Sequence, residues 1–289
     1  YGAGPRLVNT SKSAGNGAVL IFFGGSRGLS DWPNMTIQGD EKYGQYFGLG
    51  LRTVRLGPEG GTKLVVMSHM CDCGGRQRGG VWVYATSKKF KSGSSLSSNQ
   101  ADMHAKGSFD YEWFGWSAES TPRQPFLIVG SPGFGVVPSG SAVGRVSLID
   151  SKGVTKSFVV GIESKGSFGC SLGFGTLRVE SPDDVLAVGS CSSSQNQEQT
   201  IPTERHSKEH TKQSSGIGIP QAGKVTLFSV DEWMQFTDEV SVNLLSHETL
   251  LGRSELGRFG SSLSWVDIDH DGQDELVVSA PFEKNLRGA

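Results

Sequence analysis

The sequence has few helical patterns, no long apolar run and no excess of charge of either sign. No stretch approaches the roughly 18 consecutive apolar residues of a membrane-spanning helix, so we expect no transmembrane segment. Lys and Arg total 27 and Asp and Glu total 29, for a net charge of −2. The sequence has no excess of positive charge to attract nucleic acid, so nucleic acid is not an expected partner. Apolar residues seldom recur at helical spacing, and only residues 231–236, with Asp231 as N-cap, suggest a helical turn.

Histidine is also scarce, which bears on catalysis. Six histidines are scattered along the chain, and no His-Glu-x-x-His zinc signature occurs. His206 and His210 have helical i, i+4 spacing, but the Lys and Glu side chains around them favour a solvated loop over a metal site. We therefore expect no catalytic site in this sequence.

Glycine, in contrast, is abundant. The chain has 41 glycines in 289 residues, about twice the usual share of about 7%. They show no three-residue period, which excludes collagen. Short runs rich in Val, Ile, Leu and Phe lie between Gly, Ser, Pro and Asp residues, as at 18–23, 63–67, 81–84, 126–129 and 143–149. Runs of this length with turn residues at both ends predict strands and an all-β fold.

A repeat organises these strands. Four Phe-Gly pairs are each followed by an apolar strand, a loop, a second apolar strand and a turn of small residues; they begin at Phe47, Phe114, Phe168 and Phe259. Gly-led strands come next at Gly79, Gly144 and Gly223, and residues 18–23 fit the same position near the N-terminus. The Phe spacings are 67, 54 and 91 residues, and a polar insertion at 192–217 accounts for the longest. Each unit thus supplies about four strands, the content of one propeller blade.

These units resemble FG-GAP repeats, the blades of integrin-α-type seven-bladed propellers. The unit from Phe259 to Pro281 matches best, and the Trp113-Phe-Gly-Trp-Ser117 unit comes next. With its compact loops, and without integrin-like calcium loops in the other units, the pattern is most similar to the C-terminal propeller of the glycosylphosphatidylinositol (GPI)-specific phospholipases D. The resemblance implies that residues 1–289 form a β-propeller segment with about four units of an incomplete ring.

The resemblance also implies a function for the parent protein. Phospholipases of this family are secreted and hydrolyse GPI anchors with zinc held in a separate domain, which we expect to be absent from this chain. The propeller is then a non-catalytic scaffold that helps to present membrane-anchored substrate. The expected partners are the remainder of the parent chain and GPI-anchored proteins. The chain opens on Tyr1 and stops just after an apolar strand, so we expect a fragment or a processed product.

One acidic loop predicts a metal site. The run is Asp267-x-Asp269-x-Asp271-Gly272-Gln273-x-Glu275. Calcium takes six to eight oxygen ligands, and alternating carboxylates on a tight loop turn inward together. Gln273 would add its backbone carbonyl and Glu275 would close the site. We expect one structural calcium here; the alternative is an acidic turn without metal.

The four cysteines allow more than one interpretation. Cys170 follows a Phe-Gly pair, and Cys191 ends the second strand of the same unit. If these strands form a hairpin, the two ends meet, and a disulfide is geometrically reasonable; two buried free thiols are the alternative. Cys71 and Cys73 are expected to be incidental neighbours. A disulfide would favour an oxidising, extracellular compartment.

Two sequons, at Asn34 and Asn9, are candidate N-glycosylation sites if the protein is secreted.

Two other functions stay open. An integrin-α-like adhesion propeller would bind a protein ligand on one face, and several calcium loops would favour it. A carbohydrate-binding propeller would stack sugars on exposed tryptophans. The six tryptophans are more simply explained as blade-packing residues; they are Trp32, Trp82, Trp113, Trp116, Trp233 and Trp265.

Overall fold

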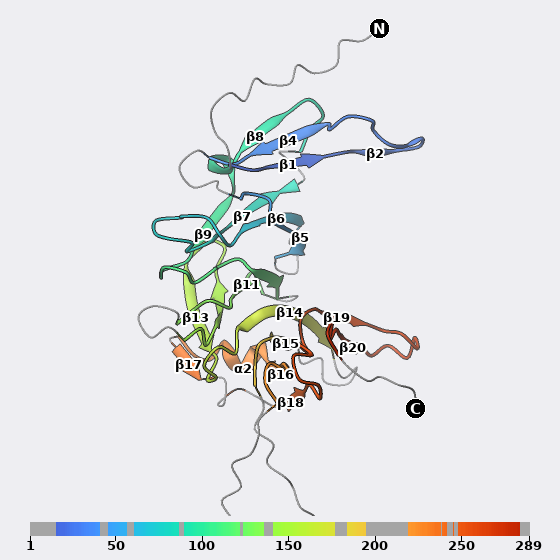
Figure 1. Ribbon diagram of the computed structural model, residues 1–289. Helices are drawn as coiled ribbons and strands as arrows, with labels where there is room; N and C mark the ends of the chain where they lie inside the picture. Colours follow the sequence, from blue (N-terminus) through green and yellow to red (C-terminus); the bar gives the residue numbers. More distant parts are fainter. Residues whose placement is uncertain are drawn as a thin grey trace, which may run out of the picture.

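The computed structural model describes residues 16–40, 46–56, 61–86, 90–121, 124–135, 141–176, 184–194, 219–237, 239–241, 245 and 248–283. Across these residues the fold is all-β and propeller-like, as the strand pattern predicts. Figure 1 shows small sheets that follow one another in chain order from the N-terminal to the C-terminal end. Asn9, His206, His210 and most of the insertion at 192–217 lie outside the described residues.

Three sheets have a complete set of blade strands. The first has the order β5-β6-β7-β9, with β5 (Gly50–Arg55), β6 (Thr62–Ser68), β7 (Gly80–Ala85) and β9 (Met103–Lys106). The second begins β10-β11-β12-β13, with β10 (Ser117–Ser120), β11 (Leu127–Ser131), β12 (Arg145–Ile149) and β13 (Thr155–Val160). The third has the order β14-β15-β16-β18, with β14 (Phe168–Thr176), β15 (Asp184–Ser190), β16 (Lys224–Ser229) and β18 (Glu248–Leu251). The first strand of each sheet starts at or just after a Phe-Gly pair.

A smaller sheet lies at each end of the array. At the N-terminal end β1 (Ala18–Ile21) pairs with β4 (Met35–Gln38), and the connecting segment folds into the hairpin β2 (Gly24–Gly25) and β3 (Gly28–Leu29). At the C-terminal end β19 (Leu263–Val266) pairs with β20 (Glu275–Val278). The two small sheets lie at opposite ends in Figure 1.

Two short strands join the outer edge of a neighbouring sheet in parallel. β8 (Ser95–Ser97) leaves the β7–β9 connection and pairs with β4, and β17 (Glu239–Ser241) leaves the β16–β18 connection and pairs with β13. Their central aliphatic side chains, Leu96 and Val240, pack against the hydrophobic clusters below. Each of these strands ties one sheet to the next.

The two helical elements are short. The 3₁₀ helix η1 (Ser98–Gln100) follows β8, and α2 (Val230–Trp233) follows β16. The N-cap of α2 is Ser229, whose hydroxyl accepts the Glu232 N–H, and not Asp231 as the sequence suggested. Asp231 lies instead in the first turn, where its charge complements the helix dipole.

The Phe-Gly pairs hold neighbouring sheets together. The glycine that opens the third strand forms a bridge with the phenylalanine of the next unit, in the pairs Gly79–Phe114, Gly144–Phe168 and Gly223–Phe259. In each pair the Phe N–H donates to the carbonyl just before the glycine. A Cβ on any of these glycines would lie 2.1–2.2 Å from the Phe carbonyl oxygen, so only glycine fits.

The core consists of apolar layers between successive sheets. One layer joins the β5–β9 and β10–β13 sheets through Val65, Val81, Leu127 and their neighbours. A second joins the β10–β13 and β14–β18 sheets through Ile128, Val188 and Phe228. Alternate side chains of each strand therefore face opposite neighbours, so both faces of each of these three sheets are buried.

Candidate metal centre

The acidic loop joins β19 to β20, and three of its carboxylates converge. Oxygen atoms of Asp267, Asp269 and Glu275 lie within 4.8 Å of one another. The loop turns because His270 and Gly272 adopt left-handed φ values of 62° and 86°. Strand pairing places Val266 opposite Glu275, which brings the two ends of the acidic run together.

Backbone N–H groups hold the loop in this shape. Glu275 accepts the Ile268 N–H at 2.7 Å, and Asp267 accepts the Gly272 N–H at 3.1 Å. The second oxygen of Asp267, Oδ1, is buried and has no hydrogen-bond partner. A buried carboxylate oxygen without a partner is costly in water-free surroundings, and a cation would satisfy it. The donor set, all hard carboxylate oxygens, fits calcium and is not a typical zinc site.

Asp271 and Gln273 have other contacts. The Asp271 carboxylate accepts both the backbone N–H and the side-chain amide of Gln273, at 2.8 and 2.9 Å. Asp271 is outside the three-carboxylate group. The spacing of the motif does not predict that Asp271 differs from the three converging carboxylates. Its carboxylate accepts hydrogen bonds from Gln273 in the same turn.

Both cysteine pairs are joined in the structure. Cys170 on β14 and Cys191 just after β15 form a disulfide with their Cα atoms 6.3 Å apart. Cys71 and Cys73 form a second disulfide across two residues, so the interpretation of this pair as incidental is wrong. Both side chains are fully buried in the β6–β7 connection, where the chain turns back tightly enough to bring two neighbouring thiols together.

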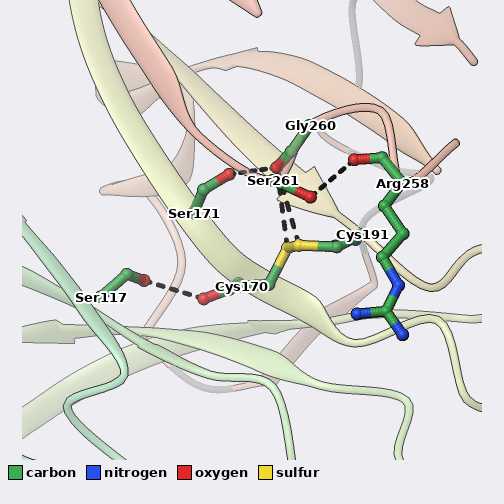
Figure 2. Close-up of a disulfide and its surroundings, with 8 residues drawn as sticks. Ser117, Cys170, Ser171, Cys191, Arg258, Gly260 and Ser261 are labelled. Carbon is green, nitrogen blue, oxygen red and sulfur yellow. Dashed lines mark hydrogen bonds between the residues drawn. A yellow bond between two sulfur atoms is a disulfide. The ribbon is translucent and has the colours of Figure 1, made fainter. Parts of the chain in front are cut away.

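The Cys170–Cys191 disulfide lies at a junction between two sheets. Figure 2 shows its sulfur atoms beside the carbonyl of Gly260, which also accepts the Ser171 hydroxyl at 2.5 Å. Ser117, at the same position one unit earlier, donates to the carbonyl of Gly169 at 2.8 Å. A serine three residues after the phenylalanine therefore binds the next Phe-Gly glycine at two successive junctions.

Two Gly-x-Ser-x-Gly runs have the letters of a hydrolase nucleophile elbow but not its geometry. Ser171 lies inside strand β14 and its hydroxyl is committed to Gly260. Ser26 lies in the turn between β2 and β3. A nucleophile elbow requires a strand, a sharp turn and a following helix, and neither serine has this setting.

The other candidate residues are spread over the molecule. Asn34 lies at the neck of the β2–β3 hairpin, where its side-chain oxygen accepts the Phe23 N–H at 2.6 Å. Trp82 and Trp233 are buried in the core, whereas Trp32 is 69% and Trp116 44% exposed. Trp116 lines a cavity of about 310 Å³ beside Arg52, where the innermost strands of successive sheets meet. Among the described helices, none is long and apolar enough to cross a bilayer.

Comparisons with known proteins agree with the repeat pattern. The FG-GAP repeat family matches residues 259–289, which include the acidic loop. Three similar proteins are phosphatidylinositol-glycan-specific phospholipases D. The protein of Dictyostelium discoideum is 29% identical over 267 residues, which cover 88% of this chain and 26% of the relative. The proteins of Rattus norvegicus and Homo sapiens are each 25% identical, over 96% of this chain and 32% of the relative.

The chain thus spans about a quarter to a third of the length of these relatives. Its described strands form propeller-like sheets joined through Phe-Gly pairs. Over most of its length, therefore, the chain is homologous to a part of the phosphatidylinositol-glycan-specific phospholipases D and has the all-β fold of an FG-GAP propeller.

Proposed function

We propose that this chain is the non-catalytic propeller portion of a secreted, GPI-specific phospholipase D-like protein, and that it binds one structural calcium ion. In this proposal the parent protein hydrolyses GPI anchors with zinc in another domain. The propeller provides a rigid scaffold that helps to present membrane-anchored substrate. The observation that carries the proposal is similarity along nearly the whole chain to a limited part of the relatives.

The arrangement of side chains supports a scaffolding role. The hydroxyls of Ser117 and Ser171, and the glycines that open the third strands, form contacts between neighbouring sheets. The described carboxylate cluster lies on a loop at one end of the array and consists of Asp267, Asp269 and Glu275. Two disulfides fit an oxidising compartment and hence secretion. The Asn34 side-chain amide, at the neck of an exposed hairpin, is the proposed N-glycan acceptor.

Calcium would stabilise the β19–β20 hairpin. Three carboxylates held within 4.8 Å repel one another, and a divalent cation removes that repulsion while satisfying Asp267 Oδ1. We expect calcium to raise the melting temperature, because a ligand that binds only the folded state stabilises it by mass action.

Calcium titration tests this part of the proposal. The purified chain should bind one calcium by isothermal titration calorimetry, and Asp267→Asn should weaken binding by about tenfold or more because one charged ligand is lost. Asp31→Asn, an exposed carboxylate at the other end of the array, is the matched control and should bind as the native chain does. Equal binding by the native chain and Asp267→Asn would contradict the site.

A hydrolysis assay tests the non-catalytic role. The purified 289-residue chain should release no lipid-free protein from a GPI-anchored substrate, with or without added zinc. Anchor hydrolysis by the chain alone would overturn the assignment of catalysis to another domain.

A further inference from the structure

A cavity of about 460 Å³ lies where the β1–β4–β8 sheet meets the β5–β9 sheet. This volume is within the range of about 300–1,000 Å³ that is typical of small-molecule sites. Room is left because Ala101, Ala105 and Gly153 in the lining have no long side chain. Gly153, in the β12–β13 turn, packs so closely on β9 that an added Cβ would lie 2.5 Å from the His104 carbonyl oxygen, so the β10–β13 sheet borders the cavity as well. The polar lining residues are Asp40, Ser98, Asn99, His104 and Lys106.

One part of the lining is a fixed aromatic stack. The rings of Trp82 and His104 have their centroids 4.8 Å apart and their planes 10° from parallel. Phe47 contacts Trp82 edge-on, with the ring centroids 5.1 Å apart. Trp82 is buried in the core, whereas His104 is exposed. A planar ring held in this way provides a surface on which the C–H face of a sugar can pack.

A hydroxyl without a partner favours a polar occupant. Ser98 is 3% exposed, and its Oγ has no hydrogen-bond partner among the described residues. The backbone beside it is fixed, because the Ser97 N–H donates to the Gln100 side chain at 2.9 Å and the Ser97 carbonyl accepts the Tyr84 hydroxyl at 3.2 Å. A buried polar group without a partner is costly, and a ligand hydroxyl in the cavity would supply one.

The other polar groups of the lining restrict the kind of ligand. Asp40 and Lys106 carry opposite charges, and the Asn99 amide offers both donors and an acceptor. Partial burial and Lys106 lower the pKa of His104, so its imidazole is neutral near pH 7 and can donate and accept. Asp40 would repel a phosphate, and an apolar ligand would leave these groups unpaired. A neutral molecule with several hydroxyls, such as a pyranose sugar, matches the mixed set.

We propose that this cavity binds a neutral sugar ring of a glycan, with the ring packed against His104 and its hydroxyls bonded to Ser98 and Asn99. The source of the sugar rests on the proposed function, whereas the cavity itself does not. A GPI-anchored glycoprotein offers two such sources, the glycan of its anchor and its N-glycans. Binding of either one would hold the substrate on the propeller while another domain acts on the anchor.

Titration of the ¹⁵N-labelled chain with the methyl glycosides of glucose, galactose and mannose tests the cavity. At least one glycoside should shift the amide resonances of Ser98, Asn99 and His104, with a dissociation constant in the millimolar range or below. Ser98→Ala and Asn99→Ala should each weaken this binding about three- to tenfold, as expected for one lost hydrogen bond. Ala101→Phe, which fills the cavity, should abolish it. Gln235→Ala removes an exposed amide beyond α2 and is the control, with native binding.

The variants separate loss of the site from loss of the fold. Ser98→Ala removes a hydroxyl that has no partner in the described chain, and Asn99 is exposed, so both variants should keep the native circular dichroism spectrum. No shift with any glycoside at about 50 mM would overturn the proposal. Native binding by Ala101→Phe and Ser98→Ala would overturn it as well, and so would tighter binding of inorganic phosphate than of every glycoside.

Glycans released from one GPI-anchored protein distinguish the two sources. Tighter binding of the lipid-free anchor glycan would support recognition of the anchor, and tighter binding of the N-glycans would support recognition of the attached protein. The proposed function is tested separately, since anchor hydrolysis by the purified chain would refute that function and leave glycoside binding in the cavity unchanged.

Discussion

Single residues at the blade junctions carry much of the specificity of this fold, and Arg145 is the strongest example. Its guanidinium forms an ion pair with Glu112, and both side chains are almost fully buried. The rings of Phe109, Phe134 and Phe158 surround it at 4.6–5.6 Å from their centroids. Burial lowers the pKa of Arg145 and the Glu112 carboxylate opposes this shift. Glu112 also accepts the N–H groups of Ser108 and Phe109.

Removing one member of this pair should be costly. We expect Glu112→Ala to lower the free energy of unfolding by about 3–5 kcal/mol, because Arg145 is left buried without a counter-charge. Lys156→Ala, which removes an exposed ion pair with Asp150, should cost about 1 kcal/mol or less. Urea denaturation of the three proteins measures the difference. Similar losses for the two variants would contradict the role of burial.

His69 should make stability depend on pH. Burial against the Trp116 ring lowers its pKa to about 4, below the value of about 6.5 in the unfolded chain. Between these two values the unfolded chain binds the proton and the folded chain does not. Stability is therefore fully present above pH 6.5 and decreases as the pH falls toward 4. His104 contributes in the same sense, since burial and Lys106 lower its pKa.

Denaturant midpoints measured between pH 4 and 7 check this prediction. His69→Gln should flatten the profile in that window while changing the midpoint at pH 7 less. An unchanged slope in His69→Gln would show that other groups cause the pH dependence.

At the scale of elements, the third strand of each blade depends on its opening glycine. Gly79 combines a φ of 81° with direct contact between its backbone and Phe114, whose carbonyl oxygen would lie 2.1 Å from an added Cβ. Gly93 has nearly the same φ, 79°, but open space around it. Comparing the same substitution at Gly79 and Gly93 therefore separates the cost of backbone strain from the cost of the steric clash.

Gly79→Ala should therefore be clearly more destabilising than Gly93→Ala. Gly93→Ala is the control, and its unfavourable φ alone should lower the free energy of unfolding by about 1 kcal/mol. Gly79→Ala adds displacement of the Phe114 strand, and we expect a total of about 3 kcal/mol or more. Thermal denaturation of both variants provides the comparison, and equal losses would exclude the junction as the cause.

The sequence predicts the second and third strands of the complete sheets well, because these strands are apolar runs with glycine or small residues at their ends. The parallel strands β8 and β17 are not predictable in this way, since Ser95–Ser97 and Glu239–Ser241 contain one aliphatic residue each and gain their order from the sheet they join. The convergence of Asp267, Asp269 and Glu275 follows from their spacing, whereas the bonding of Asp271 within its turn does not. The Cys71–Cys73 disulfide depends on a local backbone turn that no pattern of letters encodes.

On the scale of the whole molecule, the sheets of the described residues pack on their neighbours in sequence. The innermost strands follow the order β5, β10, β14 and β19, and each contacts the next. Stability in such an array is a sum of local terms, so a change at one end need not reach the other.

Hydrogen exchange with and without calcium checks this locality. Removing calcium with a chelator should reduce amide protection in β19 and β20, while β6 and β7 keep theirs. A uniform loss of protection over all sheets would indicate that the array unfolds as one cooperative unit.

The bridge between a third-strand glycine and the next phenylalanine also bears on how such proteins evolve and can be recombined. A genetic duplication of the segment from one Phe-Gly pair to the next places a phenylalanine of a Phe-Gly pair after both copies of the third-strand glycine, so each bridge can form. Chimeras cut at successive Phe-Gly pairs should consequently keep every bridge. Gene fusions that exchange a segment starting after the phenylalanine would depend on what the donor happens to place against that glycine.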